Sequence, residues 1–147
     1  MNNINSSGFL DVGDGHQLYF EDWGNPDGIP IIHNHGGPGN GFSDQHKALY
    51  DPKIHHVIFH DQRGAGRSTP FASTENNTTL DLIDDIEFIC EHFGLDTVYI
   101  AGGSWGSALS LCYAIAHPER IKGILVWGVY LISEFEEDWV NEGYPRY

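Results

Sequence analysis

The sequence predicts an α/β fold whose mainly parallel sheet is opened by an antiparallel hairpin. Two observations lead to this prediction. Short apolar runs that end in glycine-rich turns alternate with amphipathic segments of helical length, and two segments of alternating polarity flank a Gly-Asp-Gly turn near the start. Strands that alternate with helices are typical of a parallel sheet with helices packed on its faces.

The hairpin comes first along the chain. Residues 7–12 and 16–23 alternate apolar and polar side chains around Gly13-Asp14-Gly15. Such alternation indicates half-buried strands, and Gly and Asp tolerate the positive backbone angles that a tight hairpin turn needs. We therefore expect these two segments to be the first and second strands.

Four apolar runs supply the other strands, at residues 30–35, 56–61, 98–102 and 121–130. The first three are rich in β-branched and aromatic residues and do not alternate in polarity. That pattern favours buried strands of a parallel sheet covered on both faces. The run at 121–130 is expected to be the sixth strand.

Two segments between these runs have helical patterns. Residues 79–93 place apolar side chains on one stripe, carry aspartates in the first turns and are followed by Gly94. Residues 105–117 are small or apolar nearly all round and end before Pro118, which predicts a helix buried on most sides. The acidic stretch 134–138 is expected to be a solvated face.

Composition limits the possible partners. The chain has 147 residues, enough for one domain, and 7 Lys and Arg against 21 Asp and Glu give a net charge of -14. This charge repels phosphate backbones and anionic lipid headgroups, so we expect neither nucleic acid nor membrane as a partner. No stretch approaches the ~20 apolar residues of a membrane span and the N-terminus lacks the features of a signal peptide, which predicts a cytoplasmic protein.

The two cysteines, Cys90 and Cys112, fall inside the predicted helices. They lack the paired spacing of a zinc site and are too few for a disulfide framework. We expect ordinary buried thiols.

The strongest local signal is the segment Gly102-Gly103-Ser104-Trp105-Gly106, which matches G-x-S-x-G between a predicted strand and a predicted helix. A sharp turn there lifts the serine hydroxyl out of the sheet edge, at the positive end of the helix. Ser104 is therefore the candidate nucleophile, and the backbone N–H of Trp105 is a candidate oxyanion donor. The alternative is a glycine-rich turn that only joins a strand to a helix.

A second glycine-rich segment, His35-Gly36-Gly37-Pro38-Gly39, follows the third strand. Glycines leave backbone N–H groups unobstructed, so this loop can supply the other oxyanion donor, for which Gly37 is the candidate. A turn without chemistry is one alternative. A phosphate cradle is the other, but G-x-G-x-x-G would need glycine where Phe42 stands.

The segment 61–68 (DQRGAGRS) lies between these two signals. Asp61 and Arg63 are expected to hold its loop by ion pairs and hydrogen bonds, with substrate contact as the alternative. His35 is expected to shape the glycine loop by bonding its neighbours rather than to act as a base. No histidine has metal-ligand spacing, and no cofactor is expected.

HGGPG, DQRGAGRS and GGSWGS, in this order and spacing, resemble the proline iminopeptidases, serine peptidases of the α/β-hydrolase fold that remove N-terminal proline. The resemblance runs from about Phe20 to the end of the chain. It implies that Ser104 is the nucleophile of a nucleophile elbow after the fifth strand, and that the backbones of Gly37 and Trp105 form the oxyanion hole. It also implies a peptide or small amide substrate with a free N-terminus.

The chain departs from this family after the nucleophile. A triad of this fold runs Ser, then Asp or Glu, then His, yet the only histidine after Ser104 is His117. It lies 13 positions along the same helix, about 20 Å away at 1.5 Å per residue. Asp138, the only aspartate after Ser104, is followed by no histidine. The acid and the base are therefore missing.

We expect residues 1–147 to be the N-terminal part of a single α/β-hydrolase domain, with the cap and the C-terminal catalytic part absent. The chain alone is then expected to be inactive. Its sixth strand would be an exposed apolar edge, through which self-association is expected. Two alternatives stay open: an esterase, lactonase or other amidase of the same fold, because specificity lies in the absent cap, and a catalytically silent truncated or binding protein.

Overall fold

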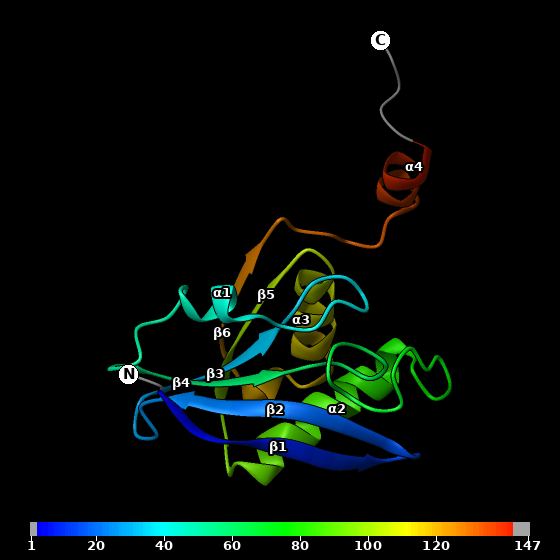
Figure 1. The fold of residues 1–147 in the computed structure, drawn as a ribbon. Helices are drawn as coiled ribbons and strands as arrows, with labels where there is room; N and C mark the ends of the chain where they lie inside the picture. Colours follow the sequence, from blue (N-terminus) through cyan, green and yellow to red (C-terminus); the bar gives the residue numbers. More distant parts are fainter. Residues whose placement is uncertain (1–2, 143–147) are drawn as a thin grey trace.

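The computed structural model of the chain describes residues 3–142. The end of the segment that carries the resemblance, residues 143–147, lies outside this part. The described strands form one six-stranded sheet in the order β1-β2-β4-β3-β5-β6 (Figure 1). The strands are β1 (Ile4–Gly13), β2 (His16–Gly24), β3 (Ile29–Asn34), β4 (His55–His60), β5 (Val98–Gly103) and β6 (Ile121–Trp127). The helices are α1 (Asp44–Lys47), α2 (Thr79–His92), α3 (Trp105–Ala116) and α4 (Glu134–Glu142), with a 3-10 turn η1 (Pro118–Arg120).

The sheet has the predicted mixed character. The hairpin β1–β2 is antiparallel and joins β4 in antiparallel register, whereas β4, β3, β5 and β6 run parallel to one another. Because β3 and β5 are adjacent, their carboxyl ends lie together, with Asn34 opposite Gly102. This crossover brings the loop after β3 beside the turn after β5, which is where ligands bind in open α/β sheets.

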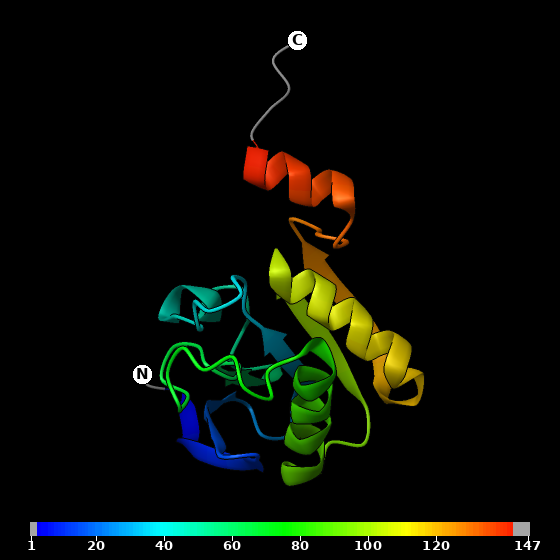
Figure 2. The same cartoon turned by 90° about the vertical axis from the view of Figure 1, so that its right-hand side faces the viewer.

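Two apolar layers pack on opposite faces of the sheet. Helices α2 and α3 lie side by side on one face (Figure 2) and bury Ile32, Ile58 and Ile100 of the central strands. On the other face, Phe42 and Tyr50 from the segment around α1 cover a smaller cluster that includes Phe59. Side chains at neighbouring positions of one strand therefore pack in different apolar layers, because successive side chains of a strand point to opposite faces of the sheet.

Several predicted boundaries were wrong. The hairpin begins at Ile4, three residues earlier than predicted. The sixth strand ends at Trp127 instead of residue 130, because Gly128 takes a positive φ of 52° that breaks the extended backbone. The acidic stretch is solvated as predicted, with Phe135 and Glu137 exposed, but it belongs to α4, a helix that the sequence did not predict. This helix stands away from the sheet in both views (Figures 1 and 2).

Burial also differs from the prediction in places. Cys90 is buried as predicted, but Cys112 is only partly buried. Tyr99 in the fifth strand is 41% exposed, so this strand is not covered along its whole length on both faces. Within the described residues β6 is one of the two edge strands, and its Leu125 is 58% exposed. The exposed apolar edge is confirmed; self-association through it stays a prediction.

Candidate active site

Ser104 occupies a sharp turn between β5 and α3. Its backbone angles, φ 54° and ψ −125°, are unusual for any residue other than glycine, and its side chain is exposed. The N–H of Ser104 donates to the carbonyl of Trp127 at 3.1 Å, which ties the turn to the end of β6. The hydroxyl therefore stands at the sheet edge, at the N-terminal end of α3, as the sequence predicted.

Crowding explains the glycines two positions either side of Ser104. A Cβ atom on Gly102 would lie 2.2 Å from the carbonyl oxygen of Gly106. A Cβ on Gly106 would lie 2.2 Å from the carbonyl oxygen of Asn34. Both obstacles are backbone atoms of crossing elements, so only glycine lets α3 start this close to β3 and β5.

The glycine loop after β3 lies against the serine turn. A Cβ on Gly36 would be 3.2 Å from the carbonyl oxygen of Gly103 and 3.5 Å from the Cβ of Ser104. Gly37 has a φ of 126°, and a Cβ there would lie 2.7 Å from the Gly39 nitrogen. The loop can therefore follow this path only with glycine at position 37.

The three predicted site residues line one cavity of about 430 Å³. Its walls are Gly37, Pro38, Ser104, Trp105, Tyr130, Ile132 and Glu137. Within residues 3–142, the N–H groups of Gly37 and Trp105 donate no hydrogen bond to the protein. Two free N–H groups and an exposed hydroxyl beside one cavity are what an acyl-transfer site needs.

His35 is bound on both sides of its ring. The N–H of Gln62 donates to Nε2 at 3.0 Å, so Nε2 carries no proton, and Nδ1 donates to the carbonyl of Gly36 at 2.7 Å. Burial lowers the pKa of His35, in keeping with a neutral ring. The prediction that His35 shapes the loop rather than acting as a base is confirmed.

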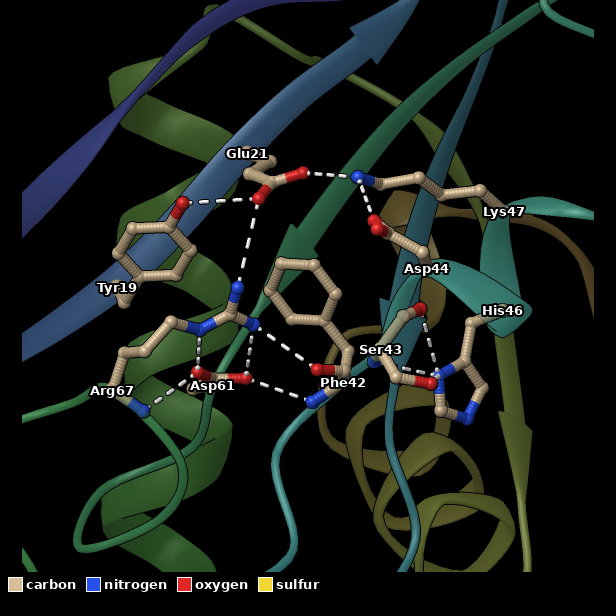
Figure 3. Close-up of polar contacts among 9 residues, drawn as sticks. All are labelled: Tyr19, Glu21, Phe42, Ser43, Asp44, His46, Lys47, Asp61 and Arg67. Atoms are coloured by element: carbon tan, nitrogen blue, oxygen red, sulfur yellow. Dashed lines mark hydrogen bonds and ion pairs between the residues drawn. The ribbon is translucent and has the colours of Figure 1, made fainter.

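Asp61 closes the far end of the glycine loop (Figure 3). Its buried carboxylate accepts the N–H of Phe42 at 2.7 Å, the N–H of Arg67 at 2.8 Å and the Arg67 Nε at 2.7 Å. Burial alone would raise the pKa of Asp61, but these hydrogen bonds outweigh it and hold the pKa below its usual value. The predicted role of Asp61 in holding the loop is confirmed, with Arg67 as its ion-pair partner.

The Arg67 guanidinium is held from several sides. It lies 4.1 Å from the ring centre of Tyr19 and 4.2 Å from that of Phe42, and it donates to the Phe42 carbonyl at 3.1 Å. Glu21 joins the same network by accepting from the Tyr19 hydroxyl at 2.9 Å, and it pairs with Lys47 of α1 at 2.6 Å (Figure 3). The loop 36–42 is thus anchored to β2, to α1 and to the segment after β4.

Arg63 also has the predicted structural role. Its guanidinium binds both carboxylate oxygens of Asp85 on α2, each at 2.8 Å, and donates to the carbonyl of Asn76 at 2.7 Å. Both Arg63 and Asp85 are buried. This ion pair ties the segment after β4 to α2.

Two residues near the site escaped the sequence analysis. Ser107 donates to the carbonyl of Ser104 at 2.6 Å and accepts the N–H of Tyr130 at 2.9 Å, which links the first turn of α3 to the segment after β6. Gln62 binds both His35 and Trp105. The only available signal for Gln62 was its place inside DQRGAGRS, between two residues that the analysis did weigh.

None of the described histidines is hydrogen-bonded to Ser104, although His33, His35 and His46 line a second cavity that Ser104 also borders. Ser104 precedes α3 and His117 follows it, so the two residues lie at opposite ends of this helix. The Nδ1 of His117 is 3.4 Å from the carboxylate of Glu119. The absence of the base from this chain stays a prediction. In this part of the chain no set of three His, Cys, Asp or Glu residues is arranged to hold a metal ion, and none of its helices is both long and apolar enough to span a bilayer.

Buried neutral histidines beside the site predict that the fold weakens in acid. Burial holds the pKa of His33 well below its usual value and that of His60 at about 3, and each is lowered further by neighbouring histidines. Because the unfolded chain takes up these protons below about pH 6.5, stability is present above that pH and is lost as pH falls toward the native pKa values. The free energy of unfolding should drop by at least about 3 kcal/mol between pH 7 and 4.5, measured by urea denaturation. A stability that stays constant over this range would contradict the neutral, buried state.

Comparisons with known proteins agree with the geometry. Residues 29–138 match the family model described as alpha/beta hydrolase fold. The proline iminopeptidase of Neisseria gonorrhoeae is 48% identical over 136 residues, 92% of this chain and 44% of that protein, and the one of Arabidopsis thaliana is 46% identical over 138 residues, 94% of this chain and 36% of that protein. The chain thus spans less than half the length of these curated relatives.

Solved structures give the same result for the fold. A proline iminopeptidase-related protein from Thermus thermophilus superposes with a TM-score of 0.74 at 27% identity, over 82% of this chain and 43% of the other. An epoxide hydrolase mutant from Vigna radiata has a TM-score of 0.75 at 22% identity, over 90% and 41%. The second likeness concerns the fold alone. The resemblance to proline iminopeptidases that the three motifs predicted is confirmed.

Proposed function

Because the chain belongs to the α/β-hydrolase fold family, we propose that it is the nucleophile-bearing, N-terminal part of a serine hydrolase domain that removes N-terminal proline from peptides. The observation that carries this proposal is the single cavity shared by Ser104, Gly37 and Trp105. The high identity to proline iminopeptidases over more than nine-tenths of the chain supports the substrate class.

In the proposed reaction the Ser104 oxygen attacks the carbonyl carbon of the N-terminal proline, while the proton of its hydroxyl passes to a base. The carbonyl oxygen becomes an anion, which accepts hydrogen bonds from the N–H groups of Gly37 and Trp105 at the positive end of α3. The intermediate collapses, the C–N bond breaks, and the base returns the proton to the leaving amine. Water then hydrolyses the acyl-enzyme by the same route.

The base and its acidic partner come, in this proposal, from residues outside the 147 of this sequence. Without them a serine hydroxyl is a weak nucleophile. The 147-residue chain by itself is therefore expected to turn over substrate at least about 10³-fold more slowly than a polypeptide that also carries the acid and the base.

The charge near the cavity suits a substrate with a free amine. Glu137 lies in its wall, and the chain as a whole carries a net charge of -14. A carboxylate in the wall of the same cavity as the reacting serine favours a protonated N-terminus over a blocked one. This supports a substrate with a free N-terminus more than a neutral ester or lactone.

The test compares four chromogenic substrates on the complete product of the gene: proline and alanine 4-nitroanilides, N-acetylproline 4-nitroanilide and a neutral 4-nitrophenyl ester. The expected kcat/KM for the proline anilide exceeds that for each of the other anilides by at least about 10-fold. Preference for the ester, or for the acetylated anilide, would replace the aminopeptidase with an esterase or another amidase. No turnover of any substrate would favour a catalytically silent protein.

A further inference from the structure

The two proposed oxyanion donors come from segments far apart in the sequence. Gly37 belongs to the loop after β3 and Trp105 to the first turn of α3, and their N–H groups have to converge on one oxygen atom. Errors of well under 1 Å in such an arrangement weaken catalysis. Some contact must therefore fix the distance between the two segments.

One side chain binds both of them. Gln62, which follows β4 and is 3% exposed, donates from Nε2 to the carbonyl of His35 at 2.9 Å and accepts at Oε1 from the indole Nε1 of Trp105 at 2.9 Å. Its own backbone N–H donates to His35 Nε2 at 3.0 Å. We propose that Gln62 is a positioning residue that sets the separation of the Gly37 and Trp105 N–H groups during acyl transfer. The inference rests on the proposed function.

The two hydrogen bonds of the Gln62 side chain require an amide group. The carbonyl of His35 needs a donor and the indole of Trp105 needs an acceptor, and a glutamine side chain offers both at one end. A glutamate would keep the acceptor for the indole but would turn an oxygen toward the His35 carbonyl. A methionine has about the same length and can replace neither bond, which leaves buried polar groups unpaired.

The backbone at Gln62 is itself held on both sides. Asp61, the preceding residue, binds Phe42 at the far end of the glycine loop, and Arg63, the following residue, forms the two-bond ion pair with Asp85 of α2. Gln62 therefore projects from a rigid stretch of backbone. A rigid anchor is what distinguishes a positioning contact from a chance hydrogen bond.

The closing experiment uses the complete gene product and the variants Gln62→Met, Gln62→Glu and Ser104→Ala, with Gln45→Met as the matched control, because Gln45 is exposed on α1 and away from the cavity. Turnover of the proline anilide is measured together with inhibition by prolylboronic acid and by proline. The boronic acid forms a B–O bond with the serine oxygen, so its tetrahedral adduct mimics the transition state. Proline, the product, tests ordinary binding.

For Gln62→Met we expect kcat to fall by about 10- to 100-fold with KM changed by less than about 3-fold. Affinity for the boronic acid should fall by the same factor as kcat, whereas affinity for proline stays constant. Gln62→Glu should lie between Gln62→Met and the unsubstituted protein, and Gln45→Met should match the latter. A merely structural role would lower the amount of active protein without changing the boronic acid and proline constants differently.

Two results overturn the inference, and they are distinguishable. If Ser104→Ala abolishes turnover while Gln62→Met leaves kcat and boronic acid affinity unchanged, or lowers both inhibitor affinities equally, Gln62 is not a positioning residue and the proposed function stands. If the unsubstituted protein shows no turnover that depends on Ser104, the proposed function and the inference fall together.

Discussion

Replacing Ser104 with alanine is expected to lower kcat/KM for a proline anilide by at least about 10⁴-fold in the complete gene product. The loss is that large because the acyl-enzyme route requires a bond to the serine oxygen. Among residues 3–142, the only other hydroxyl in the wall of this cavity is that of Tyr130. The measurement is the initial rate of nitroaniline release at substrate concentrations well below KM.

Ser6→Ala is the matched control. Ser6 is exposed on β1, and its hydroxyl is not part of the cavity. The control should keep full activity, and both variants should retain the circular dichroism of the unsubstituted protein. A Ser104→Ala protein that keeps even a tenth of the activity would remove Ser104 from the role of nucleophile.

The second large effect is on stability. Gly106→Ala is expected to destabilise the fold by about 3 kcal/mol or more, although alanine is intrinsically the better helix former by about 1 kcal/mol. The reason is the carbonyl oxygen of Asn34, which a Cβ at position 106 would approach to 2.2 Å. Withdrawal of either element is costly, because β3 is paired with β4 and β5 in the sheet and α3 is packed on β5, β6 and α2. Urea denaturation at pH 7.5 measures the change.

Gly94→Ala separates crowding from backbone strain. Gly94 follows α2 with a φ of 63°, and a Cβ there would meet nothing within 4 Å. Only the cost of the left-handed backbone remains, so this variant should lose about 1 kcal/mol. If Gly106→Ala were as stable as Gly94→Ala or more so, the close approach of α3 to β3 would not exist in solution.

Local patterns were sufficient to predict the sheet and its two covering helices. The alternation around Gly13-Asp14-Gly15 and the apolar runs at β3, β4 and β5 reflect burial, which the side chains themselves determine. Helix α2 ends before Gly94, which can take the left-handed backbone conformation that follows a helix, and α3 ends before Pro118, which cannot continue one. Such features are readable from one sequence.

Other elements depend on contacts that no local pattern records. Helix α1 is only four residues long, too short for a periodic signal, and it is fixed by the pairing of Lys47 with Glu21 on β2. Helix α4 begins after Ser133, which exchanges hydrogen bonds with Glu136. The acidic run conceals this capping pattern, so solvation was predicted and the helix was missed.

In the candidate site, too, some residues could be predicted from local sequence patterns and others depend on contacts between distant segments. Ser104, Gly37 and Trp105 could be proposed from the sequence, because each belongs to a short motif with a physical reason for its residues, and the structure places them around one cavity. The hydrogen bonds of Gln62 to His35 and Trp105 were not predictable, since they depend on three strands that bring these two residues within reach of one amide. For the same reason the sequence predicted an ion pair for Asp61 but did not identify Arg67 as its partner, which only the structure shows.

The most direct measurement is a crystal structure of the complete gene product after reaction with a fluorophosphonate. The account predicts one phosphorus atom bonded to the Ser104 oxygen, with the phosphoryl oxygen about 2.7 to 3.1 Å from the backbone nitrogens of both Gly37 and Trp105. A label on any other residue, or a phosphoryl oxygen turned toward solvent and away from these two nitrogens, would contradict it.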